Sequence, residues 1–540
     1  MRRALRLAPL LALAALLCLP VLALLGAWLP AGQEGGPSGA ILAAMAATVL
    51  PEYLWTTLWL GLFVALGAAV VGTASAAAVT LFDFRGRRQM EWLLLLPLAM
   101  PAYVTAYAYT DFLQYSGPLQ TGLREAFGLR GRLLPEVRSL TGAVWVFIFA
   151  LYPYVYLLAR TALGERAAQL MEAARLLGAS PARRIRAVAL PLARPAVAAG
   201  VALVLMETLA DYGVTSYFGI QTFTVGIYKA WLAMEDRIAA AQLATLLLAL
   251  VALLLQLELR AQRRMRFAAG GAGRAGSAEA QPQRLAGAQQ VWAWLVCLLP
   301  VAFGFVLPVL FMLRPLLADW TALPWGRFLE WAANSVRLGV ITAVLAVAIA
   351  LLLAYALRRR QDAPTRAVVQ LASLGYAVPG AVIVVGLLLP VGWLQQALPS
   401  WGLPALITTT AVGIVWAYLV RFCAVALQTV QSGYARVPAS LDDSARMLGA
   451  GRWRLLSRVH WPLLRRSSAA ALLLVFVDVM KELPATLVLR PFNSDTLAVV
   501  AYQLARDERL GEAALPSLAL VAVGLVPVIL LSRTLRGSSR

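Results

Sequence analysis

The sequence is poor in the residues on which most protein chemistry depends. Its 540 residues include three cysteines and one histidine. Cys18, Cys297 and Cys423 each lie alone in an apolar run, which excludes a disulfide framework and gives no metal-ligand spacing. One histidine, His460, makes no metal site, and we interpret it as part of a surface that docks a partner. No nucleophile and base are paired in the sequence, so we do not expect an enzyme.

Lysine is also scarce, with two residues in the chain, and this excludes an ATP site of the common kind. A phosphate-binding loop ends in Gly-Lys-Ser/Thr, and neither Lys229, in YKAW, nor Lys481, in MKEL, has that context. We therefore expect the chain to bind no cofactor of its own. Acidic residues number 26 against 47 Lys and Arg, a net charge of +21. The basic residues are confined to alternate loops, which argues against nucleic acid as the partner.

Apolar residues fill most of the chain. They make up 61% of it, and the mean hydropathy is +0.75, above the roughly 45–50% apolar content of soluble domains. Runs of about 20 apolar residues recur, each long enough to cross a bilayer as a helix. Twelve membrane spans are predicted at 7–29, 53–81, 92–112, 140–159, 195–216, 238–258, 291–313, 334–357, 367–394, 405–427, 468–489 and 514–532.

The distribution of arginine predicts the topology. With the N-terminus inside, 34 of the 47 Lys and Arg residues fall in inside segments, as the positive-inside rule requires. We therefore expect a multi-pass protein of the cell (inner) membrane with both termini in the cytoplasm. The first run, 7–29, is longer than the apolar region of a signal peptide and is interpreted as an uncleaved span. Segment 124–138, with four arginines outside, does not fit the rule.

The chain also repeats itself. A shift of 271 residues brings Gly178 onto Gly449 and Pro191 onto Pro462, and the register holds for 40 residues. We predict two parallel six-helix halves, 1–262 and 291–540, joined by a flexible cytoplasmic linker, 263–290, that is rich in Gly, Ala, Gln and Arg.

Each half carries a basic cytoplasmic insert, EAARLLGASPARRIRAVALP at 172–191 and DSARMLGAGRWRLLSRVHWP at 443–462. Residues 165–177 are strong helix formers, and Gly178 suits a left-handed helix C-cap. Ser180 and Pro181 suit the start of a second helix, which is expected to end at Pro191. An amphipathic helix on anionic lipid is the alternative interpretation.

The spacing within the inserts resembles the EAA loop of ABC importer permeases. The resemblance implies that each loop docks on a separate ATPase subunit, so two loops imply a fused permease with an ATPase dimer and an extracytoplasmic (periplasmic) binding protein as partners. It also implies the type I ABC importer permease fold. The second loop departs from the pattern at Asp443 and Trp461. The motif residues are Glu172, Ala173, Ala174, Gly178, Pro191, Asp443, Ala445, Gly449 and Pro462.

Four acids lie near the ends of two predicted spans. Glu207 and Asp211 are four residues apart, as are Asp478 and Glu482 in the repeat, so each pair shares a helix face. Because carboxylates within a membrane are costly, we expect them to line a translocation path, with capping or ion pairing as the alternative.

A stripe of Tyr103, Tyr107 and Asp111 follows helical spacing. Phenolates suit ferric iron, but aromatic belts at membrane interfaces are common. We count Tyr107 with the candidate path.

The segments METLADYGVTSYFGIQTFTVGIYKAW (206–231) and VDVMKELPATLVLRPFNSDTLAVVAY (477–502) are similar to those of bacterial ferric-iron permeases of the fused kind. The resemblance implies an importer for Fe3+. Permeases for thiamine, polyamines, sulfate or phosphonates remain alternatives, and a 6+6 secondary transporter is another.

Overall fold

The computed structural model describes residues 2–28, 38–270, 282–321, 323–360 and 362–537. The chain divides into two compact units. Unit 1 contains Met1–Ala43, Ile227–Leu248 and Pro324–Val500, and unit 2 contains Ala44–Gly226, Ala249–Leu323 and Ala501–Arg540. Each unit thus takes segments from both halves of the sequence repeat.

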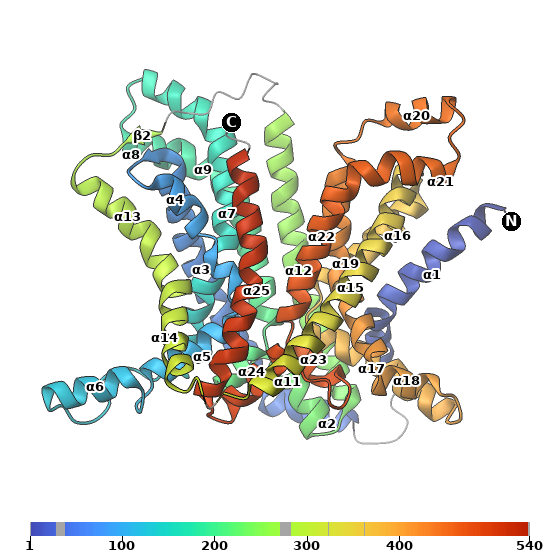
Figure 1. Ribbon diagram of the computed structural model, residues 1–540, viewed down its shortest axis with the longest axis horizontal. Helices are drawn as coiled ribbons and strands as arrows, with labels where there is room; N and C mark the ends of the chain where they lie inside the picture. Colours follow the sequence, from blue (N-terminus) through green and yellow to red (C-terminus); the bar gives the residue numbers. More distant parts are fainter. Residues whose placement is uncertain (1, 29–37, 271–281, 322, 361, 538–540) are drawn as a thin grey trace. The chain divides into compact units, whose positions relative to one another are not determined.

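Unit 2 is built around three long helices, α3 (Leu50–Leu81), α7 (Leu140–Leu176) and α9 (Leu190–Ala210), which pack on one another. Its other elements surround these three (Figure 1). They are β1 (Phe82–Asp83), α4 (Arg87–Leu93), η3 (Leu96–Ala99), α5 (Ala102–Leu113), α6 (Pro118–Phe127), α8 (Pro181–Arg184), η4 (Ile185–Ala189), α10 (Gly213–Tyr217), β2 (Gln283–Arg284), α13 (Ala288–Val301), η6 (Ala302–Val306), α14 (Leu307–Ala318) and α25 (Leu510–Gly537).

Unit 1 repeats this plan with α15 (Trp325–Arg359), α19 (Ala411–Tyr434) and α22 (Trp461–Lys481), which run side by side (Figure 1). Its other elements are α1 (Arg2–Ala23), η1 (Leu24–Trp28), α16 (Ala363–Ser373), η7 (Leu374–Ala377), α17 (Gly380–Ala397), α18 (Leu403–Thr409), α20 (Ala439–Met447), α21 (Arg452–Leu455), η8 (Leu456–His460) and α23 (Pro484–Leu489). The bounds of α2 (Ser38–Thr48), α11 (Phe223–Tyr228), α12 (Arg237–Gly270) and α24 (Leu497–Arg506) cross from one unit to the other, and η5 (Lys229–Ala233) precedes α12.

The predicted spans are largely confirmed. The described residues contain ten helices that are long and apolar enough to cross a membrane, or eleven if the bent pair 87–99 and 102–127 is one span. That pair turns by 88° near Pro101, so the predicted span 92–112 is not a straight helix. Helix α22 is not one of these ten helices, because it carries four charged residues, Arg465, Arg466, Asp478 and Lys481.

Small residues allow the three central helices of unit 2 to approach closely. A Cβ atom on Gly72 of α3 would lie 2.7 Å from Cβ of Val155 in α7, and one on Gly200 of α9 would lie 2.7 Å from Cα of Val155. Because lipid is as apolar as a leucine side chain, such close packing, rather than burial from water, drives helix association in a membrane.

The first helix of each sequence half packs in the unit built mainly from the other half. Helix α1 lies against α16 and α17 in unit 1, and α13 and α14 lie against α3 and α5 in unit 2. The last helix, α25, also packs in unit 2, against α14 and η3. The compact units are therefore a different division of the chain from the repeat.

The predicted linker, 263–290, is described except for 271–281. Helix α12 continues to Gly270. On the other side, Gln283 and Arg284 form a short parallel pairing with Phe82 and Asp83, and the amide of Leu285 donates to the Asp83 carbonyl at 2.9 Å. The end of the linker is thus bound to the loop that follows α3.

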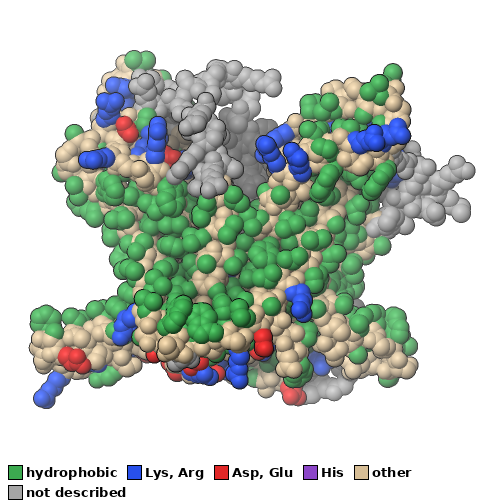
Figure 2. Space-filling view, viewed as in Figure 1, with side chains coloured by type: hydrophobic (Ala, Val, Ile, Leu, Met, Phe, Trp, Pro, Cys, Tyr) green, Lys and Arg blue, Asp and Glu red, His purple; other side chains and the backbone are tan. Residues whose placement is uncertain are grey.

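The surface of each unit has an apolar middle. Figure 2 shows hydrophobic side chains over the central part of the helices and Lys and Arg side chains towards their ends. Exposed apolar residues on α3 and α15, such as Trp55, Leu66, Val344 and Leu352, belong to this surface. An apolar surface of this extent is what a hydrocarbon environment requires.

Candidate functional site

The first basic insert begins where α7 ends. Gly178 adopts φ +78°, and the amides of Gly178 and Ala179 donate to the carbonyls of Arg175 and Ala174, both at 3.0 Å. This pair of bonds is a Schellman motif, in which glycine is favoured because it has no Cβ. The Ser180 hydroxyl then accepts from the Arg183 amide at 3.4 Å and begins α8. The predicted roles of Gly178, Ser180 and Pro181 as helix end and helix start are confirmed.

The second insert has the same backbone. Gly449 adopts φ +75°, and the amides of Gly449 and Ala450 donate to the carbonyls of Arg446 and Ala445, both at 2.9 Å. Helix α20 ends there, and α21 begins after Gly451, whose carbonyl accepts from the Leu455 amide at 2.9 Å. The 271-residue register of the sequence is therefore also a register of hydrogen bonds.

The expected helix end at Pro191 is wrong, because the chain continues through it as a helix. The π-helical segment η4 joins α8 to α9, and the amide of Leu190 bonds to the carbonyl of Ile185. The segment η8 joins α21 to α22 before Pro462 in the same way, and η6 precedes Pro308. A wider turn accommodates the proline ring, which in an α-helix lacks one N–H and meets the carbonyl of residue i−4.

Both inserts present large apolar side chains at their turns. Leu176 and Leu177 are 82% and 87% exposed, and their repeat partners Met447 and Leu448 are 89% and 86% exposed. Trp453 of the second insert is 77% exposed. Exposed apolar groups at matching places, rimmed by arginines, are typical of a surface that another protein covers.

The remaining motif residues are placed as follows. The side chain of Glu172 lies outside the described residues, while Ala173 is exposed and Ala174 and Ala445 are half-buried. Asp443 is exposed and pairs with Arg446 at 3.2 Å. Asp443 thus lies on the exposed surface of α20.

A buried polar cluster fastens the second insert to the helices of unit 1. Arg358, near the end of α15, pairs with Asp442 of α20, with Nε–Oδ2 at 2.8 Å and Nη2–Oδ1 at 3.2 Å. Its other N–H groups donate to the carbonyls of Tyr434, Val437 and Pro438 at 3.4, 2.9 and 2.9 Å. All five guanidinium donors are used, which makes this a strong, geometrically specific attachment.

His460 completes the cluster. Its Nε2 lies 2.9 Å from Oδ1 of Asp442, and its Nδ1 lies 3.2 Å from the Tyr434 hydroxyl. The ring is 1% exposed and packs edge-on against Tyr355 and Tyr434. The prediction that His460 belongs to a docking surface is therefore wrong. A lone histidine in a basic insert gave no signal that it faces inward.

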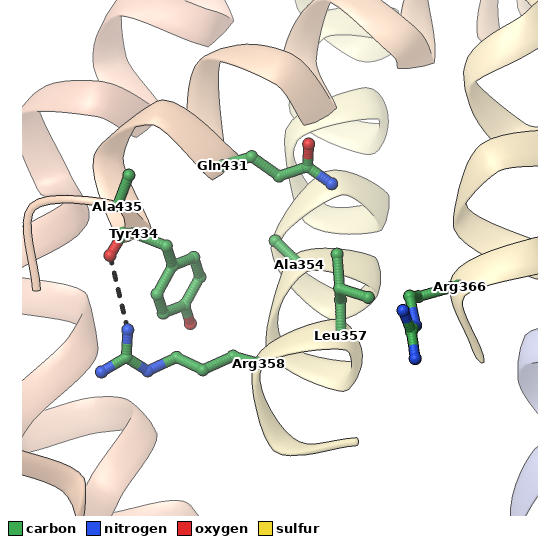
Figure 3. Close-up of a pocket in the computed structure, with 7 residues that line it drawn as sticks. All are labelled: Ala354, Leu357, Arg358, Arg366, Gln431, Tyr434 and Ala435. Carbon is green, nitrogen blue, oxygen red and sulfur yellow. Dashed lines mark hydrogen bonds between the residues drawn. The ribbon is translucent and has the colours of Figure 1, made fainter. Parts of the chain in front are cut away.

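A pocket of about 460 Å³ lies beside this cluster. Figure 3 shows Arg358 directed toward the Tyr434 carbonyl, with Arg366 of α16 and Gln431 of α19 on the other helices that line the pocket. Since the Arg358 donors are occupied, the pocket is mainly an apolar recess behind the insert. Its lining residues are Ala354, Leu357, Arg358, Arg366, Gln431, Tyr434 and Ala435.

The first insert lacks this cluster. Met171 and Ala189 stand where the repeat has Asp442 and His460. At this insert the half-buried Arg184 of α8 donates to Gln283 in the linker at 3.3 Å. The two inserts therefore share the backbone of their turns but join the membrane helices differently, since the first continues α7 and the second begins with a separate helix, α20.

Asp211 and Glu482, two of the four acids, lie where two membrane helices end. Helix α9 ends at Ala210, and Oδ1 of Asp211 accepts from the amides of Val214 and Thr215 at 2.8 and 3.3 Å. Helix α22 ends at Lys481, and Glu482 accepts from the amides of Ala485 and Thr486 at 2.9 and 3.0 Å. Each acid thus caps the short helix that follows.

Glu482 is also buried and ion-paired. It is 5% exposed, its Oε1 lies 3.3 Å from Nη1 of Arg421, and its Oε2 accepts from the Thr486 hydroxyl at 2.6 Å. Glu207 and Asp478, one turn earlier, are half-buried. The alternative interpretation, capping with ion pairing, therefore describes Glu482 in this structure.

The tyrosine stripe is divided. Tyr107 interacts electrostatically with Asp211 and with the hydroxyls of Tyr103, Tyr217 and Tyr502, all in unit 2. Asp111, two turns from Tyr103, instead faces Arg314 of α14. The described residues contain no group of three or more His, Cys, Asp or Glu side chains arranged as metal ligands.

The model of the family "Binding-protein-dependent transport system inner membrane component" matches residues 68–267 and again residues 346–536. The two matches cover more than half of the chain, and each contains one insert. They confirm the predicted type I ABC importer permease fold, in which the family domain occurs twice.

Similar proteins include full-length relatives. A "Fe(3+)-transport system permease protein" of Haemophilus influenzae is 24% identical over 488 residues, 90% of each chain. A "Probable ABC transporter permease protein" of Sinorhizobium fredii is 24% identical over 518 residues, 89% of this chain and 87% of the relative. A "Putative 2-aminoethylphosphonate transport system permease protein" of Salmonella choleraesuis is 27% identical over 194 residues, 35% of this chain and 68% of the relative.

The Arg358 cluster should depend on the Asp442 charge. Burial raises the pKa of Asp442, but hydrogen bonds from Arg358 and His460 outweigh it, so the pKa lies below its usual range. A depressed aspartate pKa stabilises the fold above the unfolded pKa, about 3.9, and this stabilisation is lost as the pH falls through the folded pKa. We predict that Asp442→Asn destabilises the second insert by about 3 kcal/mol at pH 7, since it leaves Arg358 without its counter-ion.

The measurement is amide hydrogen exchange across α20 and α21. Asp443→Asn is the matched control, because this neighbouring acid forms an exposed pair worth about 0.2–1 kcal/mol. The difference between Asp442→Asn and wild type should vanish in acid, below the folded pKa. Equal protection in the two variants at pH 7 would contradict the proposed attachment.

Proposed function

This chain belongs to the family of binding-protein-dependent transport system inner membrane components, and from that premise we propose that it is the permease of an ATP-driven importer for ferric iron. The Haemophilus relative that carries iron in its name matches along 90% of both chains. The 2-aminoethylphosphonate relative matches one third of this chain, and phosphonate is the second candidate. Thiamine, polyamines and sulfate are further alternatives.

We propose that the two inserts dock on a separate ATPase dimer in the cytoplasm, with both termini of the chain on the same side. The observation that supports this most directly is the pair of exposed apolar turns, Leu176–Leu177 and Met447–Leu448, at repeat-related positions. Two equivalent turns fit two ATPase subunits. ATP is then bound by the partner, since this chain has two lysines and neither lies in a phosphate-binding loop.

Continuity of the helices supports transmission of movement from insert to membrane. Residues 181–210 and 452–481 each form one unbroken helical run through a π segment, about 45 Å long at 1.5 Å per residue. A continuous helical run of that length connects the end of each insert directly to the membrane segment. In the proposed cycle, a loaded periplasmic binding protein docks outside, ATP closes the ATPase dimer, and the inserts move their helices so that access alternates.

The acids and Tyr107 are proposed to act along the translocation path in two ways. Asp211 and Glu482 maintain the breaks that end α9 and α22, because their carboxylates cap the following helices. Glu207 and Asp478, half-buried one turn away, are proposed to meet the cargo. Carboxylate oxygens favour hard cations such as Fe3+.

The proposed function is tested by reconstitution. We expect the chain, placed in proteoliposomes with an ATPase and a binding protein from the same genome, to hydrolyse ATP faster when the binding protein carries Fe3+. Thiamine, a polyamine, sulfate or 2-aminoethylphosphonate should have no effect. Stimulation by one of these and not by Fe3+ would replace the substrate while keeping the importer. Uptake without ATP would indicate a secondary transporter.

Docking is tested at Leu448. Leu448→Asp removes an apolar contact worth about 1.5–3 kcal/mol and should therefore weaken ATPase binding about 10–100-fold. Binding is measured with the purified subunits by sedimentation or interferometry. Leu398→Asp, which changes a leucine that is 50% exposed after α17, should leave the affinity unchanged. Equal losses in both variants would argue against docking through the insert.

The path is tested at Glu207 and Asp478. Glu207→Gln and Asp478→Asn should each reduce iron uptake, since the amides keep the shape but lose the negative charge that attracts a cation. ATPase binding should be unchanged, because both residues are distant in sequence from the insert turns. Normal uptake by both variants would remove these acids from the path.

A further inference from the structure

Helix α5 of unit 2 and helix α17 of unit 1 have the same position in their units, but α5 carries tyrosines where α17 carries aliphatic side chains. Each follows a 3-10 turn and begins after a proline, Pro101 or Pro379, with nearly identical backbone angles. Helix α5 reads AYVTAYAYTDFL, whereas α17 reads GAVIVVGLLLPVGWLQQA. Alignment on the prolines puts Val385 at the place of Tyr107 and Ala381 at that of Tyr103. At these two places the side chain is therefore a phenol in unit 2 and aliphatic in unit 1.

The tyrosines of α5 belong to a larger cluster. The rings of Tyr103 and Tyr107 lie 5.7 Å apart, and those of Tyr107 and Tyr217 lie 4.8 Å apart. Tyr502, at the C-terminal side of the chain, joins them through its hydroxyl, 2.9 Å from that of Ser216. Together, Tyr103, Tyr107, Tyr217 and Tyr502 with Asp211 form what we call the phenol cluster, and all five residues belong to unit 2.

The hydroxyl of Tyr107 is the anomaly in this cluster. Its side chain is fully buried, yet the hydroxyl makes no hydrogen bond to any described residue. An unsatisfied buried hydroxyl costs about 1–3 kcal/mol, so phenylalanine would be more stable at this position. A buried polar group that lowers stability is expected where a ligand uses it.

The rest of the cluster is held in place around that hydroxyl. Tyr217 accepts a hydrogen bond from Nη2 of Arg138 at 3.0 Å, and Arg138 in turn pairs with Glu508 at 2.6 Å. Oδ1 of Asp211 is fixed by the α10 amides. In unit 1, the equivalent acid, Glu482, is paired with Arg421, but the repeat position of Arg421 in the first half is Ala150. The carboxylate of unit 2 therefore lies among phenols rather than beside that guanidinium.

We infer that the phenol cluster is a transient site for a hard, oxygen-seeking trivalent cation, Fe3+, on its way through the protein. This inference rests on the proposed iron function and assigns the cargo-handling role to unit 2. Oxygen donors prefer hard cations, and each phenol that ligates the ion gives up its proton, so binding releases protons. A transport site must release its ion again, which fits a cluster assembled from separate helices.

The test uses the purified full-length chain in lipid nanodiscs, titrated with Fe3+ as its nitrilotriacetate complex. Ligation of Fe3+ by phenolate gives a visible charge-transfer absorption, and Ga3+ serves as the colourless control. We expect the band in the wild type and an apparent affinity at least roughly tenfold weaker in Tyr107→Phe, since losing even a residue that supports a metal ligand typically costs 10–100-fold. Because the Tyr107 hydroxyl makes no hydrogen bond to any described residue, its removal leaves no other polar group among them unsatisfied. This variant should therefore unfold at a temperature no lower than the wild type.

Tyr109→Phe is the matched control on the same helix. The Tyr109 hydroxyl donates to the Phe303 carbonyl at 2.7 Å, outside the phenol cluster, so this variant should keep the band. Absence of the band in the wild type, or its persistence unchanged in Tyr107→Phe, overturns the site. Iron-driven ATP hydrolysis without the band overturns the site alone. A band without iron-driven hydrolysis overturns the proposed function, and the role of the site in transport with it.

Discussion

Hydrocarbon cannot hydrogen-bond to a peptide group, and this constraint shapes each break in the membrane helices. Where α9 and α22 end, the next amides are satisfied by Asp211 and Glu482. Where Pro191 and Pro462 interrupt the bonding pattern, a π segment preserves the helix. Acids that would be costly as free charges thus also serve as structural groups, and prolines that would break a helix leave it continuous.

Duplication has preserved the backbone of the two halves while their side chains have diverged. The Schellman turns at Gly178 and Gly449 are the same, but only the second insert has the Arg358 cluster behind it. Conversely, unit 2 has the phenol cluster where unit 1 is aliphatic. The two units therefore carry different polar clusters on similar backbones, as expected when two copies in one chain no longer need to be interchangeable.

The sequence was informative wherever local chemistry determines the structure. Glycine at a left-handed position, Ser-Pro at a helix start and apolar runs of membrane length predicted the inserts and most spans, because these signals depend on neighbouring residues alone. His460 and Asp442 could not be placed, since their burial depends on Arg358, about 100 residues away from His460. The bend near Pro101 and the helix through Pro191 show the same limit: proline indicates a perturbation, and the packing around it decides the outcome.

The packing of α1 has a consequence for how the chain is made. Helix α1 precedes its neighbours α16 and α17 by about 350 residues, which corresponds to roughly 20–70 s at ordinary rates of translation. During that interval α1 lacks the two helices of the second half against which it packs. Neither half of the sequence can complete a unit by itself, so both units must be assembled together. Fusion in one polypeptide ensures that the two halves are made in equal amounts.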